Sequence, residues 1–191
     1  MSRNTKIILI IVCSVLLVCL LACGAGYIFF RNVGQNVMES AADTPEEAAA
    51  MGREIAEFTL PRGYKAQSGI NLMGIKMVFY GQSKDTDRMI MLLEMPVNEE
   101  LNDSSFEQMR TQMEQQSGRR MENVKTIQDR ALTIRGKPGR VVIQEGTAGE
   151  TKMRQMMVAF QGKSGLALLM VTGASKGWDQ SAYNKMIKSI K

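Results

Sequence analysis

The feature that most constrains this chain is an uninterrupted apolar segment near its N-terminus. Residues 7–30 read IILIIVCSVLLVCLLACGAGYIFF and contain no charged side chain. A helix over these residues would be about 36 Å long, which exceeds the roughly 30 Å of hydrocarbon in a bilayer. The apolar run also continues past any small-residue cleavage site, unlike a secretory signal peptide. We therefore expect residues 7–30 to form a single transmembrane helix.

Charges on the two sides of this segment indicate its orientation. Arg3 and Lys6 precede it, whereas Arg31 follows it before an acidic run that includes Asp43. By the positive-inside rule, the short N-terminus lies in the cytoplasm and the rest of the chain lies outside the membrane. The expected organisation is a cytoplasmic tail (1–6), a transmembrane anchor (7–30), a stalk (31–43) and a single extracytoplasmic domain (44–191).

A bacterial lipoprotein is the alternative to an uncleaved anchor. Leu20, Leu21, Ala22 and Cys23 resemble a lipobox, in which the cysteine is acylated and becomes the new N-terminus. In lipoproteins a polar linker usually follows that cysteine, whereas residues 24–30 stay apolar here. The sequence favours the transmembrane helix, with lipidation at Cys23 as the alternative, and both leave a domain tethered to the membrane.

The cysteine and histidine content excludes several kinds of site. All three cysteines, Cys13, Cys19 and Cys23, lie in the apolar segment, and the chain has no histidine. The domain therefore has no disulfide, no histidine-based zinc site and no serine–histidine triad. We expect a protein that is not an enzyme and has no cofactor, with a hydrolase of unfamiliar type as the least favoured alternative.

Charge is distributed unevenly along the domain. From Arg31 onward there are 22 Lys and Arg against 19 Asp and Glu, an excess too small to predict nucleic-acid binding. Residues 119–191, however, hold 14 basic and 5 acidic residues. A solvated surface is the simpler interpretation, and a docking patch for an acidic partner or for anionic headgroups is the sharper one. The basic stretch consists of Arg119, Arg120, Lys125, Arg130, Arg135, Lys137 and Arg140.

Methionine is unusually frequent, at 16 of 191 residues. Its spacing suits the apolar faces of strands and helices, where methionine packs adaptably. Thioethers also bind soft metals, so a methionine-lined pocket for copper(I) or a small apolar ligand is the alternative. The closely spaced groups are Met73 and Met77, Met89 and Met91, Met109 and Met113, and Met153, Met156 and Met157.

Capping and periodicity predict the secondary structure of the domain. Thr44, Pro45 and Glu47 form a capping box with proline at the first helical position, which predicts a helix from residue 45. Phe106, Met109 and Met113 fall on one helical face, which predicts a second helix. This second helix is expected over 104–117. The predicted strands cover 57–64, 73–80 and 88–95, the last two with one buried face.

The C-terminal part of the domain predicts four strands and a helix. Glycine-containing turns at 136–139, 146–149 and 162–165 separate strands at about 121–135, 138–147, 151–161 and 165–174. A helix over 178–190 follows, with Tyr183, Met186, Ile187 and Ile190 facing inward. The fold class is α+β with an antiparallel sheet.

This order of elements resembles the PsbP/Mog-like superfamily of α/β/α sandwiches. The shared features are Phe58, Leu60, Pro61, Gly63 and Tyr64 before the first strands, the turn at 136–139 and a closing helix ending in Ser189, Ile190 and Lys191. The resemblance covers about residues 45–191. It implies an adaptor or accessory subunit that binds other proteins, and it supplies no catalytic residue.

Together these observations predict a membrane-anchored accessory module without enzymatic activity. Its expected partners are the membrane, through a single span, and another protein of the cell envelope, with no nucleic acid. The alternative function is binding of a small apolar ligand or a soft metal in a methionine-lined pocket.

Overall fold

The described part of the chain begins at the first strand of the domain. The computed structural model describes residues 41–82, 85–96, 106, 111 and 121–191. The expected anchor 7–30, Cys23 and the stalk up to residue 40 lie outside these ranges. So does the expected helix 104–117, apart from Phe106 and Thr111, which are both helical. Within the described ranges, no helix combines the length and hydropathy that a bilayer crossing requires.

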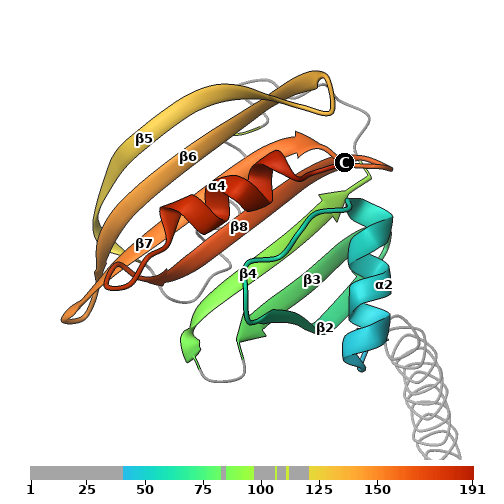
Figure 1. Cartoon of the computed structure of the whole chain (residues 1–191), viewed down its shortest axis with the longest axis horizontal. Helices are drawn as coiled ribbons and strands as arrows, with labels where there is room; N and C mark the ends of the chain where they lie inside the picture. The colour runs from blue at the N-terminus through green and yellow to red at the C-terminus, as the bar shows by residue number, and fades with distance from the viewer. Residues whose placement is uncertain (1–40, 83–84, 97–105, 107–110, 112–120) are drawn as a thin grey trace, which may run out of the picture. The chain divides into compact units, whose positions relative to one another are not determined.

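All of the described strands belong to one antiparallel sheet. They form eight strands in the order β1-β2-β3-β4-β8-β7-β6-β5. The chain makes one meander through β2–β4 and another through β5–β8, and the two meet where β4 pairs with β8 (Figure 1). β4 and β8 therefore lie at the centre of the sheet, and β5 lies at an edge. The strands are β1 (Ala41–Ala42), β2 (Tyr64–Leu72), β3 (Ile75–Gln82), β4 (Asp85–Met95), β5 (Glu122–Ile134), β6 (Lys137–Ala148), β7 (Thr151–Gln161) and β8 (Leu166–Ala174).

Helix α2 (Pro45–Ile55) begins where the sequence predicts. The Thr44 Oγ1 atom accepts a hydrogen bond from the Glu47 backbone amide at 3.2 Å. The Thr44 amide in turn donates to Glu47 Oε2 at 3.3 Å. This capping box satisfies amide groups that have no partner inside the helix. The prediction of a capped helix at this point is confirmed.

Helix α4 (Gln180–Lys188) confirms the predicted C-terminal helix. The Asp179 side chain caps it by accepting a hydrogen bond from the Ala182 amide at 2.9 Å. α2 and α4 cover the same face of the sheet and share one apolar cluster with it (Figure 1). The four residues predicted to face inward are all buried: Tyr183, Met186, Ile187 and Ile190.

The opposite face of the sheet is buried as well, so the prediction of one buried face for the strands at 73–80 and 88–95 is wrong. On β4, Ile90 and Leu92 pack under α2 and α4, whereas Met91 and Leu93 pack in a second cluster. That second cluster includes the helical Phe106, whose side chain is 1% exposed. Side chains on both faces of a central strand are apolar when both faces are covered.

The predicted strand over residues 57–64 is also wrong, because only Tyr64 belongs to a strand. The Glu57 amide donates to the Lys191 carbonyl at 3.4 Å, and the Lys191 amide donates to the Glu57 carbonyl at 2.8 Å. The Thr59 amide donates to Ser189 Oγ at 2.8 Å. This segment therefore pairs with the residues after α4 rather than with the sheet, and it holds the end of that helix in place.

The four strands predicted for the C-terminal half are confirmed as β5, β6, β7 and β8. The described residues thus show an antiparallel α+β fold with a helical layer on one face of its sheet. On the other face, the helical Phe106 packs in the second cluster.

Candidate interaction groove

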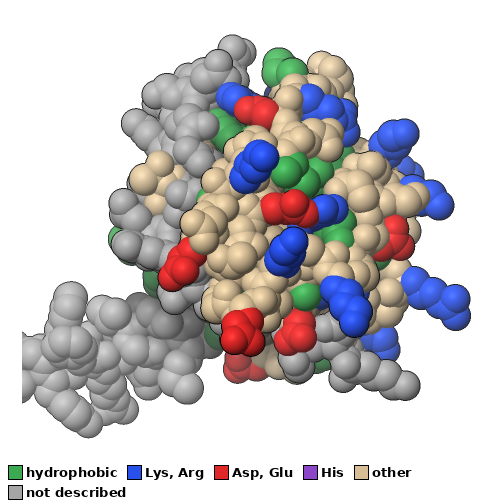
Figure 2. Space-filling view, turned by 90° about the vertical axis from the view of Figure 1, so that its left-hand side faces the viewer, with side chains coloured by type: hydrophobic (Ala, Val, Ile, Leu, Met, Phe, Trp, Pro, Cys, Tyr) green, Lys and Arg blue, Asp and Glu red, His purple; other side chains and the backbone are tan. Residues whose placement is uncertain are grey.

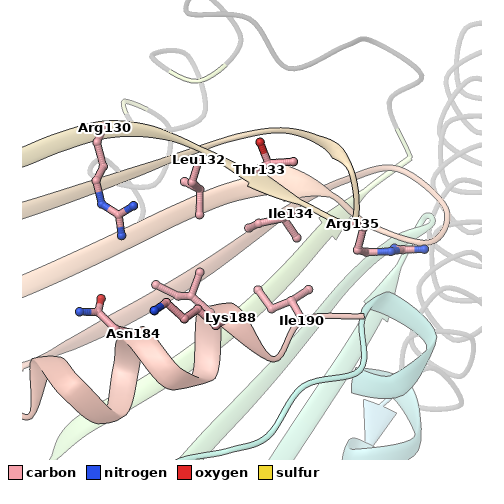
Figure 3. A pocket seen from close by; sticks show the side chains of 9 residues that line it. Arg130, Leu132, Thr133, Ile134, Arg135, Asn184, Lys188 and Ile190 are labelled. Carbon is pink, nitrogen blue, oxygen red and sulfur yellow. The ribbon is translucent and has the colours of Figure 1, made fainter.

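A groove with an apolar floor and a cationic rim lies between edge strand β5 and helix α4 (Figure 3). Its volume is about 430 Å³. Ile134, Ile187 and Ile190 are buried and form the floor, whereas Arg130, Arg135 and Lys188 are exposed. No carboxylate is among the lining residues, which are Arg130, Leu132, Thr133, Ile134, Arg135, Asn184, Ile187, Lys188 and Ile190.

β5 forms one wall of the groove because it is an edge strand. Among the described strands it pairs only with β6. Arg130, Leu132 and Ile134 occupy alternate positions and point toward α4, whereas Thr133 points away (Figure 3). The outer edge of such a strand carries backbone donors and acceptors that a further strand can bind.

α4 forms the other wall. Asn184 and Lys188 are one helical turn apart and therefore lie on the same side of the helix. The Gln180 Nε2 atom donates a hydrogen bond to Asn184 Oδ1 at 3.1 Å, which orients the Asn184 amide. Ile187 is 4% exposed and ties this side of α4 to the core.

Within the described ranges, no ion pair involves the rim residues Arg130, Arg135 or Lys188. Arg140, on the neighbouring strand, differs: its Nε and Nη2 atoms donate to the Asp129 carboxylate at 2.9 and 2.7 Å. These hydrogen bonds hold the pKa of Asp129 below its usual range. An anionic ligand of the groove would thus meet three cations that are not already bridged to carboxylates of the described structure.

Arg135 has a backbone conformation that arginine rarely adopts. Arg135 and Gly136 have φ angles of 56° and 74° and form a two-residue turn between Ile134 and Lys137. Turns with two positive φ angles favour asparagine, aspartate or glycine at the first position. The left-handed conformation costs other residues about 1 kcal/mol. An arginine at this position is therefore unfavourable for folding.

The structure divides the predicted basic stretch into several parts. Arg119 and Arg120 lie outside the described residues. Lys125 is exposed without lining the groove, and Lys137 lines a separate shallow depression. Figure 2 views the domain from the left-hand side of Figure 1 and shows Lys and Arg side chains with Asp and Glu side chains between them.

Among the described residues of that stretch, only Arg130 and Arg135 line the groove. Lys188 and Asn184 were missed by the sequence interpretation, which treated the final helix only through its buried face. Their one-turn spacing on the polar face of that helix was the available signal.

The groove differs from the methionine-lined pocket that the sequence offered as an alternative, because no lining residue of the groove is methionine. Met156 and Met157 are adjacent on β7 and pack in the clusters on opposite faces of the sheet. Met91 belongs to one of those clusters as well. In that cluster Met91 and Met157 both pair with Met170 on neighbouring strands, so these methionines are core residues on one face of the sheet.

The lining residues can bind anions but are unsuited to holding a metal ion. Guanidinium and ammonium groups donate hydrogen bonds to carboxylates or phosphates. In the part of the chain that the structure describes, no group of three His, Cys, Asp or Glu residues is close enough to hold a metal ion. The groove thus suits an anionic ligand with an apolar portion.

Comparison with known proteins gives similarity of fold. No protein-family model and no curated protein matches the chain. The solution structure of cyanobacterial PsbP from Synechocystis sp. PCC 6803 is 14% identical, with a TM-score of 0.47, and the match covers 72% of this chain and 92% of that one. LpqN, involved in cell envelope biogenesis of Mycobacterium tuberculosis, is 8% identical, with a TM-score of 0.40 and coverage of 71% and 82%. Both matches report similarity at low sequence identity and concern fold alone.

Proposed function

We propose that the protein is a membrane-anchored, non-enzymatic interaction module that binds an acidic segment of another envelope protein in the groove between β5 and α4. The observation that carries this proposal is the composition of the groove. Its floor is apolar and its rim holds Arg130, Arg135 and Lys188, with no carboxylate among the lining residues. Such a surface binds a chain that presents carboxylates and apolar side chains alternately.

The position of β5 favours a particular binding mode. An extended segment can add to an exposed sheet edge, where backbone hydrogen bonds supply affinity and alternate side chains supply specificity. Along β5, Arg130, Leu132 and Ile134 alternate toward α4. In this mode, alternate side chains of an added strand would face the groove and the remaining ones would face away. Ionic contacts with Arg130 and Lys188 then make binding weaker at high salt.

The tether is the second part of the proposal and rests on the sequence. We infer that residues 7–30 span the membrane once, with residues 1–6 in the cytoplasm and residues 44–191 outside. The alternative is lipidation at Cys23 followed by cleavage. Replacement of Cys23 by Ala distinguishes the two, since it abolishes fatty-acid incorporation and processing of a lipoprotein and leaves a transmembrane anchor in place.

Photo-cross-linking of the full chain in its own membranes tests the partner. A benzophenone amino acid replaces Lys188 in the groove or, as a control, Lys185. Lys185 lies on the same helix and is exposed, but it does not line the groove. We expect one recurrent protein cross-linked from position 188 and not from position 185, identified by mass spectrometry.

Charge reversal sharpens this experiment. With the benzophenone at position 188, Arg130→Glu should reduce the yield of the cross-linked product about tenfold, as expected for the loss of a well-ordered ionic contact. Lys185→Glu should leave the yield unchanged. Equal cross-linking from positions 185 and 188 would contradict the groove as the binding site. Binding of a long-chain carboxylate, lost in Lys188→Glu without any protein cross-link, would support the small-ligand alternative instead.

A further inference from the structure

The turn between β2 and β3 presents an apolar surface to solvent. Leu72 is 46% exposed, Met73 92% and Ile75 40%, and Ile70 on the adjoining strand is 42% exposed. We call these four residues the β2–β3 tip. The ten residues 66–75, AQSGINLMGI, contain no charged side chain. Lys76, the first charge after the tip, is paired with Glu54 at 2.7 Å.

Met73 is poorly suited to its position as far as folding is concerned. Met73 and Gly74 have φ angles of 53° and 85° and connect Leu72 to Ile75 in a two-residue turn. This geometry favours asparagine before glycine. Methionine there adopts a left-handed backbone and leaves its apolar side chain in water. The stability of the domain therefore does not explain the residue, whereas contact with an apolar environment does.

The chain enters the domain beside this tip. β1 is antiparallel to β2, with Ala42 opposite Gly69 and Ala41 opposite Ile70. Followed backward from Ala42 to Ala41, the chain thus runs toward the tip, and Leu72 lies only about 7 Å further along β2. Residues 31–40 can extend over at most about 35 Å. A membrane anchor at residues 7–30 would therefore keep Ala41 within about 35 Å of the bilayer.

We propose that the β2–β3 tip inserts into the outer surface of the bilayer, with Met73 at the boundary between headgroups and acyl chains. The inference rests on the proposed tether. Leu72 and Ile75 flank Met73 across the turn and supply further apolar area. Because the tip has no charge of its own, its contact depends on apolar burial rather than on anionic headgroups, so neutral lipids suffice and salt has little effect.

Fluorescence quenching by lipids tests the insertion in the full chain. The native cysteines all lie at positions 13, 19 and 23, so changing them to Ala leaves a background without cysteine. Met73→Cys is then labelled with the fluorophore NBD, and the protein is reconstituted in phosphatidylcholine vesicles with or without doxyl-labelled lipid. Circular dichroism and flotation with the vesicles establish folding and membrane attachment.

Glu150→Cys is the matched control, because Glu150 is an exposed residue of another two-residue turn. Gly149 and Glu150 join Ala148 to Thr151. The register places this turn at the opposite end of the sheet. The tip precedes β3, whose first residues lie beside Met95, and Met95 pairs with Leu166. Leu166 also pairs with Gln161 at the end of β7, whereas Glu150 lies before the start of β7. A label at position 150 should therefore stay in water.

We expect doxyl lipids to reduce the emission at position 73 about twofold or more, because an interfacial group lies within about 10 Å of the acyl chains. Emission at position 150 should not change, and high salt should not relieve the quenching at 73. Equal emission changes at 73 and 150 would overturn the proposal. So would a label at 73 that is shielded from water but not quenched by lipid, which would indicate a protein contact. Failure of the protein to float with the vesicles would contradict the proposed tether as well. Cross-linking in the groove tests the protein partner independently.

Discussion

The hydroxyl groups of Tyr64 and Tyr183 lie 3.0 Å apart and share a buried hydrogen bond between the beginning of β2 and α4. This contact joins the first meander, β2–β4, to the helix that forms one wall of the groove. Tyr183→Phe should lower the free energy of unfolding by about 1 kcal/mol, the usual value of one such bond. Urea denaturation of the full chain in detergent measures the change.

Tyr64→Phe provides the companion measurement. Because both substitutions remove the same hydrogen bond, the double variant should lose less stability than the sum of the two single variants. Strict additivity would show that the two hydroxyl groups do not interact energetically. Tyr183→Phe should reduce groove cross-linking more than Tyr64→Phe does, because Tyr183 is part of α4 itself.

Gly52 determines how closely α2 approaches the sheet. A methyl group at this position would overlap the Tyr80 hydroxyl group, and the Tyr80 side chain is only 4% exposed. Burial also raises the pKa of Tyr80 above its ordinary value. Gly52→Ala should therefore destabilise the domain by about 1–3 kcal/mol through overpacking, despite a gain of about 1 kcal/mol in helix propensity.

The double variant Gly52→Ala/Tyr80→Phe is the control for this prediction. Removing the Tyr80 hydroxyl group leaves room for the new methyl group, so thermal unfolding of the double variant should occur closer to that of the parent. If Gly52→Ala alone proved stabilising, the close contact between α2 and β3 would not be what limits this position.

The local parts of the fold could be predicted because their causes are local. The capping box at Thr44 and Glu47 involves residues three positions apart, and the inward face of α4 follows the helical period. The strand predicted over residues 57–64 was wrong for the opposite reason. Its apolar residues are typical of a strand, but its backbone partners are Lys191 and Ser189 at the far end of the chain.

The groove could be predicted only in part, because it joins segments that are distant in the sequence. Arg130 and Arg135 stood out as members of a basic stretch. Their relation to Lys188 depends on β5 lying at the sheet edge and on α4 packing back across the same face. Periodicity shows which side of a strand is apolar, but it does not show which element covers that side.

The ion pair between Asp129 and Arg140 makes stability depend on pH. Hydrogen bonding to Arg140 lowers the pKa of Asp129 below its ordinary value of 3.8. The folded state therefore binds this proton less tightly than the unfolded state, so the pair stabilises the fold above about pH 4 and loses its effect as pH falls through the lowered pKa. The Asp129 side chain is 40% exposed, and solvent screening limits the effect to below about 1 kcal/mol.

Urea denaturation at several pH values checks this dependence. The stability difference between the parent and Asp129→Asn should be constant near neutral pH and should vanish in strong acid. Glu122→Gln, at the beginning of the same strand, is the control and should show no comparable loss. A difference that persisted unchanged in strong acid would show that the carboxylate charge is not responsible.

Met73 and Arg135 occupy equivalent positions in two turns of the same kind, each followed by a glycine with positive φ. Asparagine tolerates the left-handed conformation better than either residue, so Met73→Asn and Arg135→Asn should each raise the free energy of unfolding by about 0.5–1 kcal/mol. The two variants should differ in function. Met73→Asn should weaken membrane contact, measured by lipid quenching of NBD attached at Ile75→Cys, and should leave groove cross-linking intact. Arg135→Asn should do the reverse. If neither variant gained stability, these two residues would be explained by folding alone, and the functional reading of both turns would be contradicted.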